Sequence, residues 1–206
     1  DIDNRRFLAD VERWLNVTIE TAINPKFPDY SAETVWDRRK AMSFSGGAPC
    51  TGELKKAARQ HYERENPSDW IVLGFTAEEK RRHDGFVLTE RDDLLPVLIE
   101  AGMTKQDCAE MIHTAGLKLP RMYRLGYPNA NCIGCVKATS PTYWNHVRRV
   151  HPEVFWRRAE QSRRLGVRLV RVKNVRIFLD ELDPDARGRP MKSLDFECGI
   201  FCEEIK

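Results

Sequence analysis

The stretch that decides the fold runs Tyr123-Arg124-Leu125-Gly126-Tyr127-Pro128-Asn129-Ala130-Asn131-Cys132-Ile133-Gly134-Cys135. Its last four residues place two thiols on a turn that follows glycine and proline, so both sulfurs can face one point in space. Such a pair can supply two thiolate ligands to a zinc ion or an iron–sulfur cluster, or it can act as a redox pair. The turn by itself leaves these alternatives open.

The other thiols lie far from this turn in the sequence. Cys50 is upstream, at the start of a predicted helix, where unpaired amides favour a thiolate. Cys198 and Cys202 lie near the C-terminal end, and Cys108 falls on the apolar side of a predicted helix, as a core thiol does. We expect folding to bring Cys50 and the C-terminal thiols onto the Cys132–Cys135 turn.

Composition indicates a folded protein with reduced thiols. A chain of 206 residues suits one domain, or one domain with an appendage. Six cysteines are too sparse for a disulfide scaffold, which predicts a cytoplasmic location. No apolar run approaches the roughly 18–20 residues that span a membrane. The first six residues are charged and lack the apolar core of a signal peptide, so no membrane association is expected.

Positive charge gathers in one region of the chain. Residues 148–176, from Arg148 to Arg176, contain ten Lys and Arg residues but only two acidic ones, Glu153 and Glu160. Such a basic arm can bind an anionic ligand or nucleic acid, or it can be the solvated face of a helix.

Helices and strands are predicted to alternate along the chain. Apolar periodicity and capping residues predict helices at 4–16, 31–39, 50–64, 104–115, 141–150 and 152–165. Apolar and β-branched runs predict strands at 17–21, 70–75, 94–98 and 167–178. This order predicts an α/β fold with a mostly parallel sheet flanked by helices, in a core of residues 1–130. Residues 131–206 would add the Cys-x-x-Cys turn, a basic helical extension and a cysteine-bearing tail.

Four segments, in order, resemble the phosphoadenosine phosphosulfate (PAPS) reductase family of the adenine-nucleotide α-hydrolase superfamily. Pro49–Lys55 is similar to its Cys-Thr-x-x-Leu-Lys helix start, and Leu73–Arg82 to its Gly-Ile-Arg-x-x-Glu-Ser-x-x-Arg segment. The course from Leu95-Pro96-Val97-Leu98 to Tyr123–Tyr127 resembles Leu-Pro-Ile…Leu-Tyr-x-x-Gly-Tyr. Glu197-Cys198-Gly199-Ile200 resembles the Glu-Cys-Gly-Leu-His tail.

The resemblance implies that an adenine nucleotide (PAPS, adenylyl sulfate or ATP) binds at the carboxyl edge of the sheet. It implies that Cys198 is the nucleophile, whose thiolate attacks the sulfur of a sulfonucleotide. The resulting S-sulfonate would be reduced by a thiol partner such as thioredoxin. The residues that the resemblance assigns to the anionic ligand are Lys55, Gly74, Glu79, Arg81, Arg82 and Arg124.

The resemblance also implies a metal centre. The adenylyl-sulfate reductases of the family carry a 4Fe–4S cluster on a Cys-Cys pair and a later Cys-x-x-Cys. Here Cys50, Cys132 and Cys135 match three of the four positions, and Thr51 stands at the other. The fourth thiolate would come from Cys202 or Cys198, with zinc as the alternative metal.

The chain also departs from the family pattern. Thr76, Lys80 and Phe201 replace the expected arginine, serine and histidine, and no Ser-Gly-Gly-x-Asp-Ser phosphate loop occurs in the 206 residues. The family places that loop before the helix predicted at 4–16, so either it lies upstream of residue 1 or the protein lacks it. Two alternatives therefore stay open: ATP-dependent sulfur insertion into tRNA or DNA, and a catalytically silent, metal-containing module that contacts nucleic acid through residues 148–176.

Overall fold

The computed structural model describes residues 2–44 and 46–191, which form two compact units. Unit 1 contains residues 20–66 and 129–191, and unit 2 contains Ile2–Ile19 and Pro67–Pro128. The chain therefore passes between the units three times. The predicted division into residues 1–130 and 131–206 stays a prediction.

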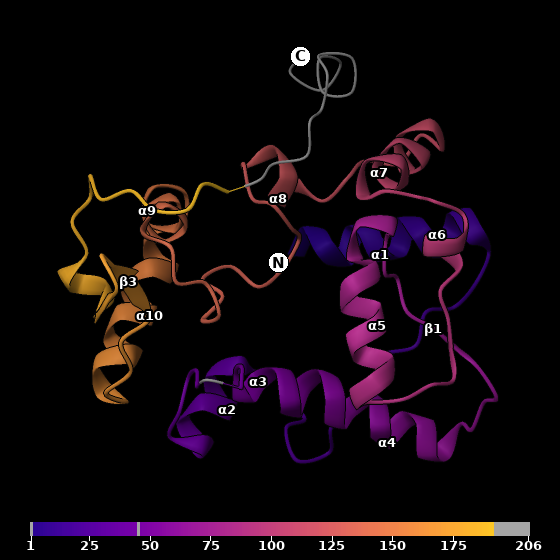
Figure 1. The fold of residues 1–206 in the computed structure, drawn as a ribbon, viewed down its shortest axis with the longest axis horizontal. Helices are drawn as coiled ribbons and strands as arrows, with labels where there is room; N and C mark the ends of the chain where they lie inside the picture. The colour runs from indigo at the N-terminus through magenta and orange to yellow at the C-terminus, as the bar shows by residue number, and fades with distance from the viewer. Residues whose placement is uncertain (1, 45, 192–206) are drawn as a thin grey trace. The chain divides into compact units, whose positions relative to one another are not determined.

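Unit 1 is built mainly from helices, drawn in purple and orange in Figure 1. They are α2 (Ala32–Arg39), α3 (Pro49–Thr51), η1 (Gly52–Ala57), α4 (Ala58–Glu65), α9 (Pro141–Val150), α10 (Pro152–Arg164) and η3 (Leu179–Glu181). Ser31 caps α2, because its hydroxyl accepts a hydrogen bond from the amide of Thr34 at 3.2 Å. Prolines occupy the first position of α9 and α10, where no amide donor is needed. These helices confirm the predictions for the same segments.

The segment from α3 to α4 is one continuous helical stretch whose middle is π-helical. Pro49 begins it, and the backbone between Gly52 and Ala57 follows the wider π pattern before α4 resumes the α pattern. The sequence predicted the helix but not this change of winding. Cys50 therefore lies one turn before a local expansion of its own helix.

The core of unit 1 lies between α9, α10 and a β-hairpin. Trp144 and Phe155 are fully buried, and their rings meet edge to face with centroids 6.5 Å apart. The hairpin pairs β3 (Val170–Val172) with β4 (Val175–Ile177) in antiparallel register. The predicted single strand at 167–178 is therefore wrong. Lys173 and Asn174 turn the chain with φ values of 45° and 69°, and this turn contains no glycine to mark it.

Unit 2 combines six helices with one short parallel pair of strands (Figure 1). Strands β1 (Ile71–Val72) and β2 (Leu94–Leu95) pair with Ile71 opposite Leu94 and Val72 opposite Leu95. The helices are α1 (Ile2–Leu15), η2 (Ala77–Glu79), α5 (Lys80–Thr89), α6 (Val97–Glu100), α7 (Lys105–Thr114) and α8 (Arg121–Arg124). Thr104 and Asp107 form the capping box of α7, where the sequence placed its start.

The fold is mixed α/β, with a much smaller sheet than the sequence predicted. The described residues contain only the parallel pair β1–β2 and the antiparallel hairpin β3–β4. No strand forms at 17–21, and the run 70–75 contributes only Ile71 and Val72. Within this run Phe75 is buried, whereas Trp70 is 60% and Val72 55% exposed. Among the helices described, none combines the length and apolarity that crossing a membrane requires.

Candidate functional site

The Cys132–Cys135 turn is fixed on helices α9 and α10. Gly134 has a φ of +67°, and a Cβ at this position would lie 2.9 Å from Cγ1 of Val154 and 3.3 Å from Cγ of Arg158. Only glycine fits this backbone conformation and this close approach. The amide of Cys135 donates a hydrogen bond to the hydroxyl of Tyr143 at 2.9 Å. The turn therefore has one defined position in unit 1.

Cys50 belongs to unit 1, as do the two thiols of this turn. Burial raises the pKa of the Cys50 thiol, and the neighbouring Cys135 and Cys132 raise the pKa further by their negative charge. Groups interact in this way only when they are near each other. The expectation of a thiolate at the helix start is wrong, because burial raises the pKa of this thiol. All three cysteines are reduced.

A buried tryptophan faces Cys50 from α2, which packs against α3. Trp36 is only 2% exposed, and its Nε1 has no hydrogen-bond acceptor within the described part of the chain. Trp36 also lowers the pKa of the Cys50 thiol, against the larger effect of burial. The sequence analysis did not single out Trp36, since an apolar residue in an amphipathic helix carries no signal beyond core packing.

The three thiols do not form a complete metal site. Across residues 2–44 and 46–191, no group of three or more His, Cys, Asp or Glu side chains is arranged to hold a metal ion. The predicted fourth ligand, Cys202, and the predicted nucleophile, Cys198, lie outside the described residues. The role of these cysteines as ligands and nucleophile therefore stays a prediction.

Four of the predicted nucleotide-binding residues lie on one segment of unit 2. Gly74, Glu79, Arg81 and Arg82 follow β1 at its carboxyl end, the edge that the sequence analysis assigned to the ligand. Arg82 pairs with Glu79 at 2.5 Å, and its Cζ lies 5.2 Å from the ring centroid of Phe75. Arg81 is exposed.

The other two predicted ligand residues lie apart from this segment. Arg124 is on α8, where its charge lowers the pKa of Asp3 to a small extent after the larger effect of Arg6. Lys55 is exposed and belongs to unit 1. The structure therefore groups the residues of the Leu73–Arg82 motif but not the complete predicted set.

Lys105 connects the motif segments of unit 2, and the sequence analysis missed it. Its backbone amide donates to Glu78 at 3.1 Å, and its Nζ donates to the carbonyl of Pro128 and lies 5.2 Å from the Tyr123 ring centroid. Burial lowers the pKa of Lys105, whereas the carboxylates of Glu79 and Glu78 oppose this shift. A lysine in the first turn of a helix gives no sequence signal of such burial.

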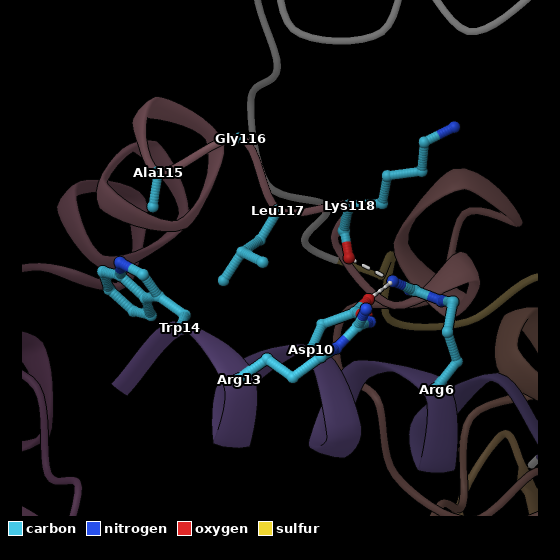
Figure 2. Close-up of a pocket in the computed structure, with 8 residues that line it drawn as sticks. All are labelled: Arg6, Asp10, Arg13, Trp14, Ala115, Gly116, Leu117 and Lys118. Carbon is cyan, nitrogen blue, oxygen red and sulfur yellow. Dashed lines mark hydrogen bonds and ion pairs between the residues drawn. The ribbon is translucent and has the colours of Figure 1, made fainter. Parts of the chain in front are cut away.

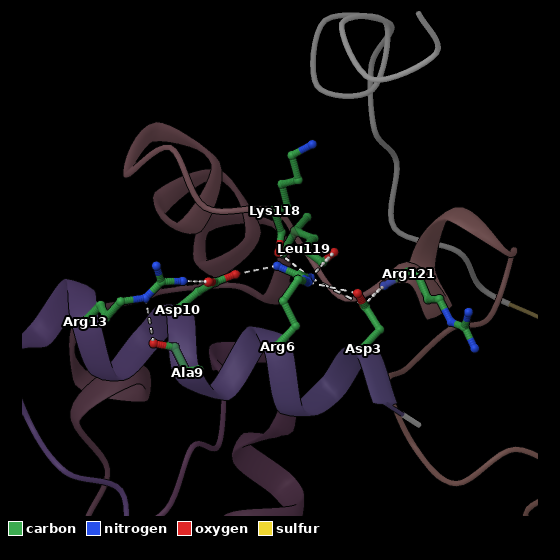
Figure 3. A network of polar contacts seen from close by, with 8 residues as sticks. All are labelled: Asp3, Arg6, Ala9, Asp10, Arg13, Lys118, Leu119 and Arg121. Carbon is green, nitrogen blue, oxygen red and sulfur yellow. Dashed lines mark hydrogen bonds and ion pairs between the residues drawn. The ribbon is translucent and has the colours of Figure 1, made fainter.

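A groove of about 500 Å³ in unit 2 lies between α1 and the segment that follows α7 (Figure 2). It is lined by Arg6, Asp10, Arg13, Trp14, Ala115, Gly116, Leu117 and Lys118. Figure 3 shows the ion pairs beside this groove. Arg6 pairs with Asp3 at 2.8 Å and with Asp10 at 2.6 Å, and Asp10 also pairs with Arg13.

Arg6 also fixes α1 to the chain that follows the groove. Its Nη2 donates to the carbonyls of Lys118 and Leu119 at 3.0 and 3.2 Å, and the amide of Arg121 donates to Asp3 at 2.6 Å. This network holds α1 against the chain segment that follows α7, and we call it the clamp on α1. Its role is structural, because Arg6, Asp3 and Asp10 already have partners within unit 2.

Many arginines of the basic arm are neutralised inside unit 1. Arg157 and Arg158 pair with Glu33 at 3.0 and 2.7 Å, and Arg164 pairs with Asp37 at 2.7 Å. Arg163 pairs with Asp180 and Glu181. The charge count of residues 148–176 could not show this pairing, because the acidic partners lie in other segments of the chain and meet the arginines only in the folded structure. The arm therefore offers less unpaired charge than its composition indicates.

No family model, curated protein or solved structure matches this chain. Its function is therefore inferred from the geometry of the thiol site and from the residues that surround it.

Proposed function

We propose that the protein is a PAPS reductase-like, sulfur-handling protein in which Cys50, Cys132 and Cys135 bind a 4Fe–4S cluster, or alternatively a zinc ion. The observation that supports this proposal is that Cys50 and the Cys132–Cys135 turn, distant in sequence, belong to the same unit, where the charges of Cys135 and Cys132 raise the pKa of Cys50.

The chemistry of the surrounding residues fits a metal-bound thiolate. Thiolates bind both zinc and iron–sulfur clusters. The indole N–H of Trp36 is a buried donor without an acceptor, and a thiolate sulfur beside it would supply one. Cys202 or Cys198 would complete the ligand set. A bound cluster or zinc would supply positive charge that stabilises the thiolates and ties the tail to unit 1.

The nucleotide part of the proposal is supported by the parallel pair β1–β2. Its carboxyl edge leads into the segment with Gly74, Glu79, Arg81 and Arg82. Val72 and Leu95 face each other in register and are 55% and 40% exposed. Parallel sheets are normally covered on both faces, so we propose that this pair belongs to a larger, mostly parallel sheet. In this proposal Cys198 is the nucleophile, and Arg81, Arg82 and Arg124 of unit 2 hold the anionic ligand.

Metal analysis tests the central claim. The full chain is purified anaerobically, its absorption near 400 nm is recorded, and its iron, sulfide and zinc are measured. We expect a bound metal that is lost in Cys50→Ser, Cys132→Ser and Cys135→Ser. Cys108→Ser is the matched control, because this thiol lies in unit 2. A metal content that survives all three substitutions would remove these cysteines from the centre.

Activity assays separate the proposed reactions. Release of sulfite from PAPS or adenylyl sulfate, with a thiol reductant such as thioredoxin, is expected to depend on Cys198. Sulfite release that Cys198→Ser retains would exclude it as the nucleophile. Release of pyrophosphate from ATP only when tRNA or DNA is present would instead favour sulfur insertion.

A second candidate function, a nucleic-acid-binding module, is favoured by the β3–β4 hairpin. Arg171 lies directly opposite Arg176 in the register, an arrangement in which like charges repel, and exposed Lys173 lies in the turn between them. A phosphate backbone would relieve this repulsion. Fluorescence anisotropy with labelled RNA and DNA tests this function. Arg171→Gln should weaken binding several-fold, whereas the control Arg163→Gln, which removes an already paired charge, should not.

A further inference from the structure

The groove of unit 2 has two chemically different ends. Trp14, Ala115 and Leu117 gather at one end, where Figure 2 shows the Leu117 side chain directed into the groove. The ion pair of Arg6 with Asp10 lies towards the other end. The groove therefore presents an apolar surface and a charged surface to the same small molecule.

Both walls of the groove are fixed by contacts within unit 2. The wall on α1 consists of four residues at i, i+4, i+7 and i+8 spacing, which share one face of the helix: Arg6, Asp10, Arg13 and Trp14. In the opposite wall Gly116 has a φ of +73°. The amides of Gly116 and Leu117 donate back to carbonyls of α7 at 2.8 and 3.1 Å, as in a Schellman motif. Because the clamp on α1 joins the two walls, a ligand would need to order little of the protein.

The groove carries more positive than negative charge. Arg6, Arg13 and Lys118 line it, and Asp10 is the one acidic side chain among the described residues that do so. When Asp3 is also counted, because it pairs with Arg6, three cationic groups still face two carboxylates. An excess of positive charge favours an anionic ligand.

Arg13 and Trp14 are the side chains that such a ligand can reach. The guanidinium of Arg13 is positioned by Asp10 and by the carbonyl of Ala9 at 3.3 Å, yet the side chain is 78% exposed. A guanidinium has five N–H donors, so it can also bind an oxygen of a carboxylate or phosphate. Trp14 is 40% exposed, and its ring is a flat surface on which a planar group can stack.

We propose that this groove binds a small organic anion, whose planar ring packs on Trp14 and whose carboxylate or phosphate pairs with Arg13. Its volume of about 500 Å³ lies within the range of small-molecule sites. Two sources of this chemistry are an aromatic carboxylate and a nucleoside monophosphate. The residues assigned to the nucleotide under the proposed function do not line the groove, so this inference does not rest on that function.

Isothermal titration calorimetry of the full chain with matched probes tests the inference. The anionic probes are 2-naphthoate and adenosine monophosphate, and their neutral counterparts are 2-naphthamide and adenosine. We expect the anion to bind about fivefold or more tightly than its neutral counterpart, with a difference that shrinks as salt is added. Binding of 2-naphthoate alone would identify an aromatic carboxylate as the source, and binding of adenosine monophosphate alone would identify a nucleotide.

Two substitutions separate the contributions of charge and ring. Arg13→Gln should remove the preference for the anion and leave the affinity for the neutral probe unchanged. Its control is Arg5→Gln, an exposed position on α1 that does not line the groove. Trp14→Ala should weaken binding of both kinds of probe by about fivefold or more, because stacking is lost. Its control is Trp70→Ala, which removes a 60% exposed ring outside the groove.

The results that would overturn the inference are distinct from a failure of the proposed function. Equal affinity for an anion and its neutral counterpart would overturn it, and so would the absence of binding at millimolar concentration. Binding that Trp14→Ala and Arg13→Gln both leave unchanged would do the same. Binding of adenosine monophosphate that is lost in Arg82→Gln but kept in Trp14→Ala would support the proposed function and count against the groove.

Discussion

The guanidinium of Arg158 lies over the indole ring of Trp36 and donates from Nη1 to Oε1 of Glu33 at 2.7 Å. A buried arginine is tolerated when its charge is paired and its planar group stacks on an aromatic ring. Arg158 meets both conditions with two residues of α2, although it lies on α10. The contact therefore joins two segments of unit 1 that are far apart in sequence.

Replacing Arg158 should destabilise unit 1. Arg158→Met removes the stacked cation and one partner of Glu33, but Glu33 keeps Arg157 at 3.0 Å. We expect a loss of about 1–3 kcal/mol in the free energy of unfolding, measured by urea denaturation. The control is Arg157→Met, whose side chain is 55% exposed and should cost no more than about 1 kcal/mol. Equal losses for the two variants would contradict the structural role of the stacked pair.

Gly134 and Gly166 form a matched pair of glycines. Both have a positive φ, +67° and +69°, but a Cβ on Gly134 would meet Val154 at 2.9 Å whereas a Cβ on Gly166 would meet nothing within 4 Å. Gly134→Ala should therefore lower the free energy of unfolding by about 2–4 kcal/mol, and Gly166→Ala by only about 1 kcal/mol. The second substitution introduces backbone strain without a steric clash. Thermal unfolding measures both. The proposed metal site predicts in addition that the Gly134 variant loses metal, whereas the Gly166 variant keeps it.

Acid should weaken the clamp on α1 through Asp3. The hydrogen bond from Arg6 holds the pKa of Asp3 below its ordinary value of 3.8, and the amide of Arg121 lowers it further. A carboxylate with a lowered folded pKa contributes stability above its unfolded pKa and loses this contribution as the pH falls through the folded pKa. We expect the melting temperature to fall below about pH 4, and to fall less in Asp3→Asn. The same acid dependence in both proteins would show that Asp3 contributes nothing.

The turn of the β3–β4 hairpin offers a stabilising substitution. Lys173 has a φ of 45°, which costs a lysine more than it costs asparagine. Lys173→Asn should raise the free energy of unfolding by about 0.5 kcal/mol, whereas Lys173→Val should lower it by about 1 kcal/mol, because a β-branched residue is strained at positive φ. Urea denaturation of the two variants checks the opposite signs. A more stable valine variant would be incompatible with this backbone conformation.

The sequence predicted the helices well because their signals are local. Ser31 and the Thr104–Asp107 capping box mark helix starts, and Pro141 and Pro152 occupy first turns. The sequence also predicted that Cys50 joins the Cys-x-x-Cys turn, from the small number of thiols and a family resemblance and not from any local pattern, and this grouping stays a prediction. Helix boundaries and thiol spacing can be recognised without knowing the tertiary contacts.

The strands and the supporting residues of the thiol site were predicted poorly because they depend on partners distant in sequence. The β-branched run 17–21 finds no neighbouring strand in the described structure and stays irregular. The pairing of Arg158 on α10 with Glu33 on α2, and the packing of α2, which carries Trp36, against α3, join segments that are distant in sequence. Nothing in the local sequence distinguishes Trp36 from any other core aromatic residue.

The π-helical winding between Gly52 and Ala57 has a consequence for how the chain tolerates length changes. A π segment accommodates one more residue than an α-helix over the same rise. Deleting one residue there would let the segment relax to regular α geometry while Cys50 keeps about the same direction relative to α4. Deleting one residue from the regular helix α4 would instead rotate Cys50 by about 100° relative to the residues that follow the deletion. The wide turn is thus the place where this helix can lose a residue without moving its cysteine to another side.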